Sequence, residues 1–227
     1  MSVTAILGVD VSKSYRYDLV LSSISLKVAR GECYTLLGAN GSGKTTLLRL
    51  FATLLAPTAG TIEIEGHHSL TQKPEARAHL FFIGHASHLY DDLTAIENIR
   101  FALGMRGISV GPSEIKQAID VMGMGPFGRY KTRHLSKGMQ KRLAFAKALL
   151  ARPRVLLLDE PYASLDEPGI ETVNACLKDF LAQGAAVLMS SHDRAHAAAV
   201  THRAGVLRQH LLQEISPSDL PRSYALF

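Results

Sequence analysis

The chain has 227 residues, a formal net charge of +5 and two cysteines, Cys33 and Cys176. This length suits one compact domain, and no apolar stretch reaches the roughly 20 residues that a membrane-spanning helix needs. Residues 1–10 lack the features of a signal peptide, and two cysteines do not make a disulfide framework, so a cytoplasmic location is expected. The positive charge is compatible with a solvated surface, nucleic acid, an anionic membrane or a polyanionic ligand.

The first third of the chain alternates between strand and helix patterns. Apolar residues alternate with polar ones over residues 24–28, which predicts a half-buried strand, and Cys33–Leu37 predicts a short buried one. A helical pattern follows over residues 44–56 and is punctuated by Pro57 and Gly60. Residues 61–65 alternate again and predict a half-solvated strand.

The middle of the chain, residues 86–153, is predicted to be mostly helical. Thr94 and Glu97 form a capping-box pattern, and two further helices are expected to begin at Ser113 and Ser136. Continuous apolar runs at 155–158 and 186–189 then predict strands that are covered on both faces. Strands separated by helices predict an α/β fold with a mainly parallel sheet, an N-terminal antiparallel β portion and an inserted α-helical subdomain.

A glycine-rich segment lies between the second predicted strand and the first predicted helix. Residues 38–45 read GANGSGKT and match the phosphate-loop pattern G-x-x-x-x-G-K-[ST], which favours a sheet of the P-loop NTPase type over a chance glycine-rich turn. The glycines let backbone N–H groups face phosphate, and the helix adds its positive N-terminal end. Lys44 is expected to contact the β- and γ-phosphates, and the Thr45 hydroxyl to ligate Mg²⁺. The predicted nucleotide-binding residues are Gly38, Ala39, Asn40, Gly41, Ser42, Gly43, Lys44, Thr45 and Thr46.

Two acidic residues follow the buried strand predicted at 155–158. Asp159 is expected at the carboxyl edge of the sheet, where it can hold Mg²⁺ directly or through water. Glu160 points elsewhere because it is the next residue, and it can orient the attacking water. The alternative interpretation is a pair of solvated turn residues.

With its further motifs, the chain resembles the ATP-binding cassette family over essentially its whole length, and the motifs occur in the order that this family has. Residues 135–140 (LSKGMQ) resemble its signature motif, and residues 163–166 (ASLD) resemble its D-loop. His192 resembles its switch histidine, and Tyr15 lies where the family stacks an aromatic ring on adenine. Lys137 departs from the commonest signature, which has glycine there, whereas Gly138 is retained.

The resemblance implies an ATPase that uses ATP and Mg²⁺, with Lys44, Glu160 and His192 as catalytic residues. It also implies a dimer with a second nucleotide-binding subunit, in which Ser136, Gly138 and Asp166 contribute to nucleotide binding. Integral membrane transporter subunits are implied as partners, which places the chain at the inner face of the cell membrane. The expected organisation is one nucleotide-binding domain over residues 1–227, with an ATP-binding core at 1–85 and 154–227 and a helical signature subdomain at 86–153.

His85 stands where the family usually has a glutamine that helps to bind Mg²⁺ and links the site to the membrane subunit. Neutral histidine can ligate metals and can also titrate near neutral pH. Because Mg²⁺ prefers oxygen ligands, a contact through water or a coupling role is favoured over direct ligation.

The cargo is predicted from a softer resemblance. Gly84 and His85, followed by residues 89–95, resemble the haem-exporter ATP-binding subunits of cytochrome c maturation. That subfamily does not itself bind haem, so no direct haem binding is expected, and the ten histidines show no Cys/His spacing typical of a metal site. The alternatives are an exporter of a drug, lipid or polysaccharide, a regulatory cassette without turnover, and a cassette protein working on nucleic acid or the ribosome. The last is disfavoured because the chain has neither a second cassette nor a long coiled-coil insertion.

Overall fold

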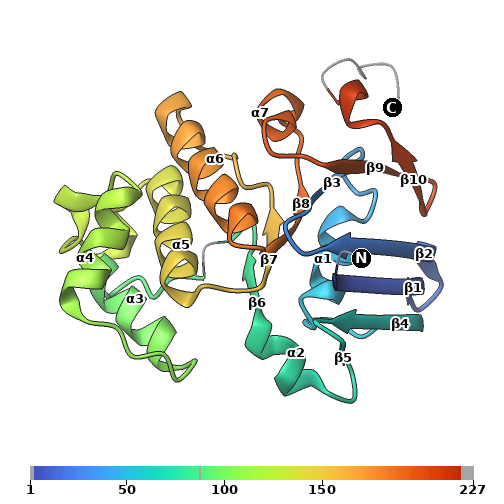
Figure 1. Ribbon diagram of the computed structural model, residues 1–227, viewed down its shortest axis with the longest axis horizontal. Coiled ribbons are helices and arrows are strands. Elements are labelled where there is room, and N and C mark those ends of the chain that lie inside the picture. The colour runs from blue at the N-terminus through green and yellow to red at the C-terminus, as the bar shows by residue number, and fades with distance from the viewer. Residues whose placement is uncertain (1–2, 87, 221–227) are drawn as a thin grey trace.

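The computed structural model describes residues 3–86 and 88–220 and contains two β-sheets (Figure 1). In the larger sheet, adjacent strands are parallel except at one edge, where the last two strands of the chain pair in the antiparallel sense. The smaller sheet is antiparallel and is formed mainly by the N-terminal segment. This is the predicted α/β fold. The larger sheet has the order β10 (Leu211–Ile215), β9 (Arg203–Arg208), β3 (Cys33–Leu37), β8 (Ala186–Ser190), β7 (Val155–Asp159) and β6 (Leu80–Ile83), and the smaller has β2 (Asp18–Ala29), β1 (Thr4–Tyr15), β4 (Ala59–Ile64) and β5 (His67–His68).

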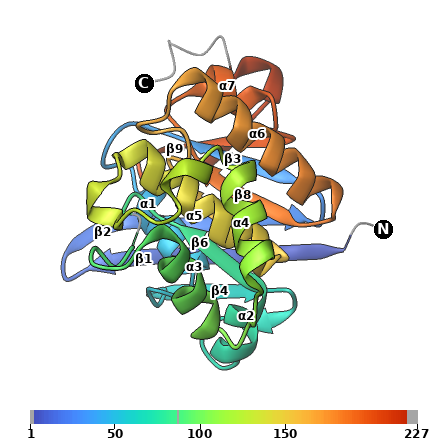
Figure 2. The same ribbon diagram turned by 90° about the vertical axis from the view of Figure 1, so that its left-hand side faces the viewer.

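The helices form layers on either side of the larger sheet. The buried residues of α1 (Lys44–Phe51) pack between the two sheets. On the opposite face, α5 (Lys137–Ala151) and α6 (Glu167–Ala182) cover the sheet. Beyond α5, α3 (Ala95–Gly104) and α4 (Pro112–Val121) lie at one end of the molecule (Figure 1), the end that faces the viewer in Figure 2. The remaining elements are α2 (Lys73–His79), α7 (Arg194–Ala198) and short 3-10 helices at Gly125–Phe127, Thr132–His134 and Pro217–Asp219.

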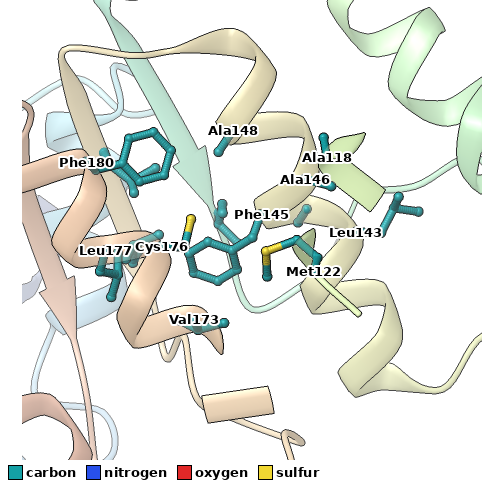
Figure 3. Packing of buried hydrophobic residues seen from close by; sticks show 14 of the residues in the cluster. Ala118, Met122, Leu143, Phe145, Ala146, Ala148, Val173, Cys176, Leu177 and Phe180 are labelled. Atoms are coloured by element: carbon teal, nitrogen blue, oxygen red, sulfur yellow. The ribbon is translucent and has the colours of Figure 1, made fainter. Parts of the chain in front are cut away.

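The hydrophobic core is divided by the larger sheet. Because successive strand residues point to opposite faces, Cys33 belongs to the cluster under α5 and α6, whereas Tyr34 belongs to the cluster around α1. In the first cluster, the Phe145 ring of α5 lies between Met122 and the α6 residue Cys176 (Figure 3). Burying side chains of this size stabilises each by roughly 1.5–3 kcal/mol, so this cluster fixes α5 on the sheet.

The first helix is shorter than the predicted 44–56, because it ends at Phe51. Thr53 adopts a left-handed backbone conformation with φ of 58°, and the amides of Leu54 and Leu55 both donate to the Arg49 carbonyl. Arg77 of α2 holds this turn, since its Nε donates to Thr53 Oγ1 at 2.7 Å and its Nη2 to the Thr53 carbonyl at 3.1 Å. A residue 24 positions away therefore ends the helix.

Two helix starts agree with the sequence and one differs. The capping box of Thr94 and Glu97 is present, and Ser136 caps α5 by accepting the Met139 amide at 3.2 Å. The helix expected at Ser113 begins instead at Pro112, because the backbone N–H of Gly111 donates to the Glu114 carboxylate at 2.7 Å.

The segment from residue 205 onward completes β9 and supplies β10, which form one edge of the larger sheet. Residues 1–2, 87 and 221–227, which belong to the predicted domain ranges, lie outside the described residues. None of the helices within 3–86 and 88–220 has the length and apolar character needed to cross a membrane.

Candidate functional site

The predicted phosphate loop connects β3 to α1 at the carboxyl edge of the larger sheet. Gly43 is the N-cap of α1 and has φ of 106°, and a Cβ at this position would lie 2.9 Å from Leu21 Cδ2, so only glycine fits without strain. Lys44 is buried, and its Nζ donates to the carbonyl oxygens of Gly38 at 2.7 Å and Ala39 at 3.0 Å. The lysine therefore closes the loop through the loop's own backbone.

Burial lowers the pKa of Lys44 from its ordinary value, and the nearby carboxylates of Glu160 and Asp159 oppose this shift. A buried ammonium favours an anionic partner, because a paired charge costs much less free energy than an isolated one. The loop thus holds a cation in a position where a phosphate group would improve its environment.

Asp159 connects the loop to the end of β7. Thr45 Oγ1 donates to Asp159 Oδ2 at 2.9 Å, and Ser190 Oγ donates to Asp159 Oδ1 at 2.7 Å. A hydroxyl and a carboxylate are therefore adjacent, as a Mg²⁺ site on this loop requires. Ser190 also accepts the Glu160 amide at 3.1 Å, so one serine orients both acidic residues.

Glu160 has a left-handed backbone conformation with φ of 51°. Its carboxylate faces the segment after β8, where the His192 amide donates to Oε2 at 3.0 Å and His192 Nε2 lies 3.4 Å from Oε1. Among the described residues, Glu160 Oε1 and the phosphate-loop hydroxyl of Ser42 are both buried without a hydrogen-bond partner. Unpaired buried oxygens at a site of this kind are typical of groups that await a ligand or water.

These segments surround a pocket of about 580 Å³. The structure thereby brings together the phosphate loop, the two acidic residues and both histidines that the sequence singled out. The lining residues are Val20, Asn40, Gly41, Gly43, Lys44, Thr45, Thr46, His85, Asp159, Glu160 and His192.

The residues that line the pocket fit a nucleoside triphosphate with Mg²⁺. No group of three or more His, Cys, Asp or Glu residues that could hold a metal occurs in the described part of the chain. Mg²⁺ does not need one, since it usually takes one or two protein oxygens and completes its octahedral shell with water and substrate phosphates. Thr45 and Asp159 supply such oxygens.

Seven predicted site residues are not among those that line this pocket: Gly38, Ala39 and Ser42 of the phosphate loop itself, and Tyr15, Ser136, Gly138 and Asp166 elsewhere. Tyr15 is half-exposed at the end of β1, with Lys13 Nζ 4.9 Å from its ring centroid. Asp166 caps α6 by accepting the Gly169 amide at 3.2 Å, and Ser136 and Gly138 form the start of α5. Ser136, Gly138 and Asp166 thus belong to the starts of α5 and α6 and not to the segments that line the phosphate-loop pocket.

The start of α5 packs against the 163–166 segment at Gly138. A Cβ at Gly138 would lie 2.3 Å from the carbonyl oxygen of Ser164, a contact that side chains do not tolerate. Glycine is therefore required for the close approach of two backbones, independently of any ligand.

Gly138→Ala is expected to lower the free energy of unfolding by about 1–3 kcal/mol, because the helix start and the Ser164 segment must separate. Urea unfolding of the nucleotide-free chain measures this. Gly104→Ala is the matched control, since an added methyl at this helical glycine meets nothing within 4 Å and should stabilise by about 0.4–1 kcal/mol. Equal effects of the two substitutions would contradict this packing.

Sequence reasoning missed two polar residues at the site. Ser190 directly follows the strand predicted at 186–189 and is the last residue of β8, and only the pairing of Asp159 with Ser190 across β7 and β8 reveals its role. Lys141 lies in α5, buried, and its Nζ donates to the carbonyls of Gly84, Asp159 and Glu160. Helical spacing gave no signal for it, because Lys141 is two positions from both Met139 and Leu143 and so lies on the opposite side of the helix from that apolar face.

The family model of the ABC transporter domain matches residues 21–163. The chain is 34% identical over 192 residues to the cytochrome c biogenesis ATP-binding export protein CcmA of Cupriavidus necator, covering 85% of this chain and 84% of that protein. It is 36% identical over 213 residues to the spermidine/putrescine import ATP-binding protein PotA of Methylococcus capsulatus, covering 91% of this chain and 54% of that protein.

Solved structures give the same result. An ATP-binding subunit of an ABC transporter superposes with a TM-score of 0.87 at 26% identity, covering 98% of this chain and 94% of the other. The dimeric, post-hydrolysis ATP-binding cassette MJ0796 with ADP and Pi superposes with a TM-score of 0.85 at 25% identity, covering 93% and 98%.

Proposed function

The chain belongs to the ABC transporter family as an ATP-binding subunit, and from this membership we propose that it hydrolyses MgATP to drive a membrane transport complex. The observation that carries the proposal is that Lys44 of the phosphate loop and the acidic residues Asp159 and Glu160 line the same pocket. A regulatory cassette without turnover is disfavoured, because each group needed for hydrolysis lies at this pocket.

The residues of the pocket have separate roles in this proposal. Bound MgATP supplies the γ-phosphoryl group that is transferred to water. Lys44 and the loop amides bind and stabilise the phosphoryl charge, and Thr45 with Asp159 holds the cation. Glu160 orients the attacking water and accepts its proton, and His192 contacts the γ-phosphate while its backbone N–H fixes the Glu160 carboxylate.

We place the remaining predicted residues in a dimer. Ser136, Gly138 and Asp166 lie outside the phosphate-loop pocket, which agrees with a role toward the nucleotide of a second subunit. The dimeric MJ0796 cassette supports this arrangement. Tyr15 is half-exposed and would stack on adenine at the rim of the site. The division of the chain into an ATP-binding core at 1–85 and 154–227 and a helical signature subdomain at 86–153 is part of the same proposal.

His85 is proposed as a coupling residue or a contact to Mg²⁺ through water. It is exposed at the end of β6 and lines the phosphate-loop pocket. It also lines an adjoining hollow with Leu54, Leu55 and His88, so it lies between the nucleotide site and the outer surface. Membrane transporter subunits are the proposed partners, with the chain at the inner face of the membrane.

For the cargo, we propose the haem-export or haem-release complex of cytochrome c biogenesis. The Gly84–His85 pair supports it, and so does the CcmA likeness, which covers most of both chains. The PotA relative named for spermidine and putrescine import is equally similar in identity, although this chain spans about half of its length. Because membrane subunits select the cargo, other cargoes are the second candidate, and a nucleic-acid role is disfavoured.

Deletion of the gene from its source organism is expected to remove haem covalently attached to c-type cytochromes. Haem staining of membrane and periplasmic fractions measures this. Complementation with the wild type should restore the stain, and complementation with Glu160→Gln should not. Unchanged cytochromes in the deletion strain would exclude the haem proposal and leave the ATPase with another cargo.

A further inference from the structure

Lys141 is a buried charge that the roles described above do not use. It lies in the second turn of α5 with 6% of its surface exposed. Its Nζ donates to the carbonyl oxygens of Gly84 at 3.2 Å, Asp159 at 3.4 Å and Glu160 at 3.2 Å. One ammonium group therefore connects α5 to two separate segments at the carboxyl edge of the sheet.

Both of these segments belong to the nucleotide site. Gly84 directly precedes His85, which lines the pocket, and Asp159 and Glu160 supply its carboxylates. Ser136 of the signature motif at residues 135–140 is the N-cap of α5, five residues before Lys141. A displacement of α5 relative to the sheet would thus pull on the pocket through Lys141.

The Glu160 backbone depends on such a contact more than its neighbours do. Its φ of 51° is a conformation that residues other than glycine adopt at a cost, so surrounding bonds must maintain it. The N–H is held by Ser190 Oγ, and the carbonyl accepts from the Ala163 amide at 3.3 Å and from Lys141. The carboxylate then receives the His192 amide. Of these contacts, only Lys141 carries a full positive charge.

The electrostatics agree with the geometry. Burial lowers the pKa of Lys141, and the charges of Asp159 and Glu160 raise it, so the acidic pair helps to keep the ammonium protonated. Lys147, two turns further along α5, is as buried, but burial alone lowers its pKa, to about 8. The two lysines lie on the same helix and are about equally buried, and they differ in their contact with the nucleotide site.

We propose that Lys141 is a positioning residue that holds Glu160 in its left-handed conformation and ties the His85 segment to α5. The role in hydrolysis rests on the proposed ATPase function. The tether itself does not, because its three hydrogen bonds are made between residues of this chain.

The first test is hydrogen–deuterium exchange of the nucleotide-free chain. Lys141→Met should accelerate exchange at the amides of Ala163 and His192 by about tenfold, the effect of losing roughly one hydrogen bond's stabilisation from this local structure. Lys147→Met removes an equally buried lysine from the same helix and should leave both amides unchanged. Wild-type exchange rates in Lys141→Met would overturn the proposal whether or not the chain is an ATPase.

The second test separates binding from turnover. In Lys141→Met, kcat should fall about 10- to 100-fold while the Kd for ATP, measured by calorimetry, changes less than about threefold, because a misplaced base affects the transition state more than nucleotide binding. Lys141→Arg should recover part of kcat, and Lys147→Met should match the wild type. A wild-type chain that does not hydrolyse ATP would refute the proposed function. The hydrogen–deuterium exchange result would still show whether Lys141 holds the Glu160 segment.

Lys141→Gln is measured in parallel in case the methionine variant does not fold. It retains N–H donors without the charge and is expected to be intermediate in both exchange and kcat. A Lys141→Gln chain that equals the wild type in both amide exchange and kcat would overturn a role for the positive charge of Lys141.

Discussion

Glu160→Gln is expected to bind ATP with nearly wild-type affinity and to hydrolyse it roughly 10²- to 10⁴-fold more slowly. The amide keeps the size of the carboxylate and can still accept the His192 amide, so the local structure is preserved. It cannot accept the proton of the attacking water. Phosphate release with saturating MgATP measures the loss, and size-exclusion chromatography should show an ATP-dependent dimer.

The matched control for this variant is Glu171→Gln, an exposed position on α6. It makes the same loss of one negative charge away from the pocket and should keep wild-type turnover. Near-normal turnover in Glu160→Gln would assign the base to another residue, and loss of ATP binding would assign Glu160 to the nucleotide instead.

Lys44→Ala is expected to weaken ATP binding by about 10- to 100-fold, which corresponds to the loss of a hydrogen bond to a charged group. The Lys44 ammonium is buried within the loop, and its two hydrogen bonds to the carbonyl oxygens of Gly38 and Ala39 hold the loop through its own backbone. Isothermal titration calorimetry with MgATP measures the affinity.

Lys27→Ala is the control for Lys44→Ala, because it removes one positive charge from an exposed position of β2. It should leave the affinity unchanged. A Lys44→Ala chain that still melts cooperatively and binds ATP as the wild type does would contradict the phosphate-loop assignment.

The parts of the site that the sequence predicted are encoded by contiguous residues. The phosphate loop is recognisable because a buried strand, a glycine-rich turn and a helix follow one another within Cys33–Phe51. The acidic pair is recognisable because it ends a continuous apolar run. The mainly parallel sheet follows from such runs separated by helices.

The missed features depend on segments that are distant in sequence. Arg77 ends α1 from another helix, and Ser190 reaches Asp159 only through the register of β7 with β8. Lys141 satisfies three carbonyls from two segments, which no periodicity records. Gly138 was read as a ligand contact, whereas the structure adds a packing reason through Ser164. The roles of these residues thus depend on tertiary contacts between segments that are distant in the sequence.

The order of strands in the larger sheet affects how the protein is made. Strand β3, which carries the phosphate loop, has β8 and β9 as its two neighbours, and both come from the C-terminal part of the chain. Cys33 pairs with Val187, so a ribosome adding about 5–20 residues per second completes β3 at least several seconds before its partners exist. During that interval an apolar strand with two open edges is available for pairing with other chains. The strand order therefore leaves both edges of β3 without their native partners until residues 186–208 have been translated.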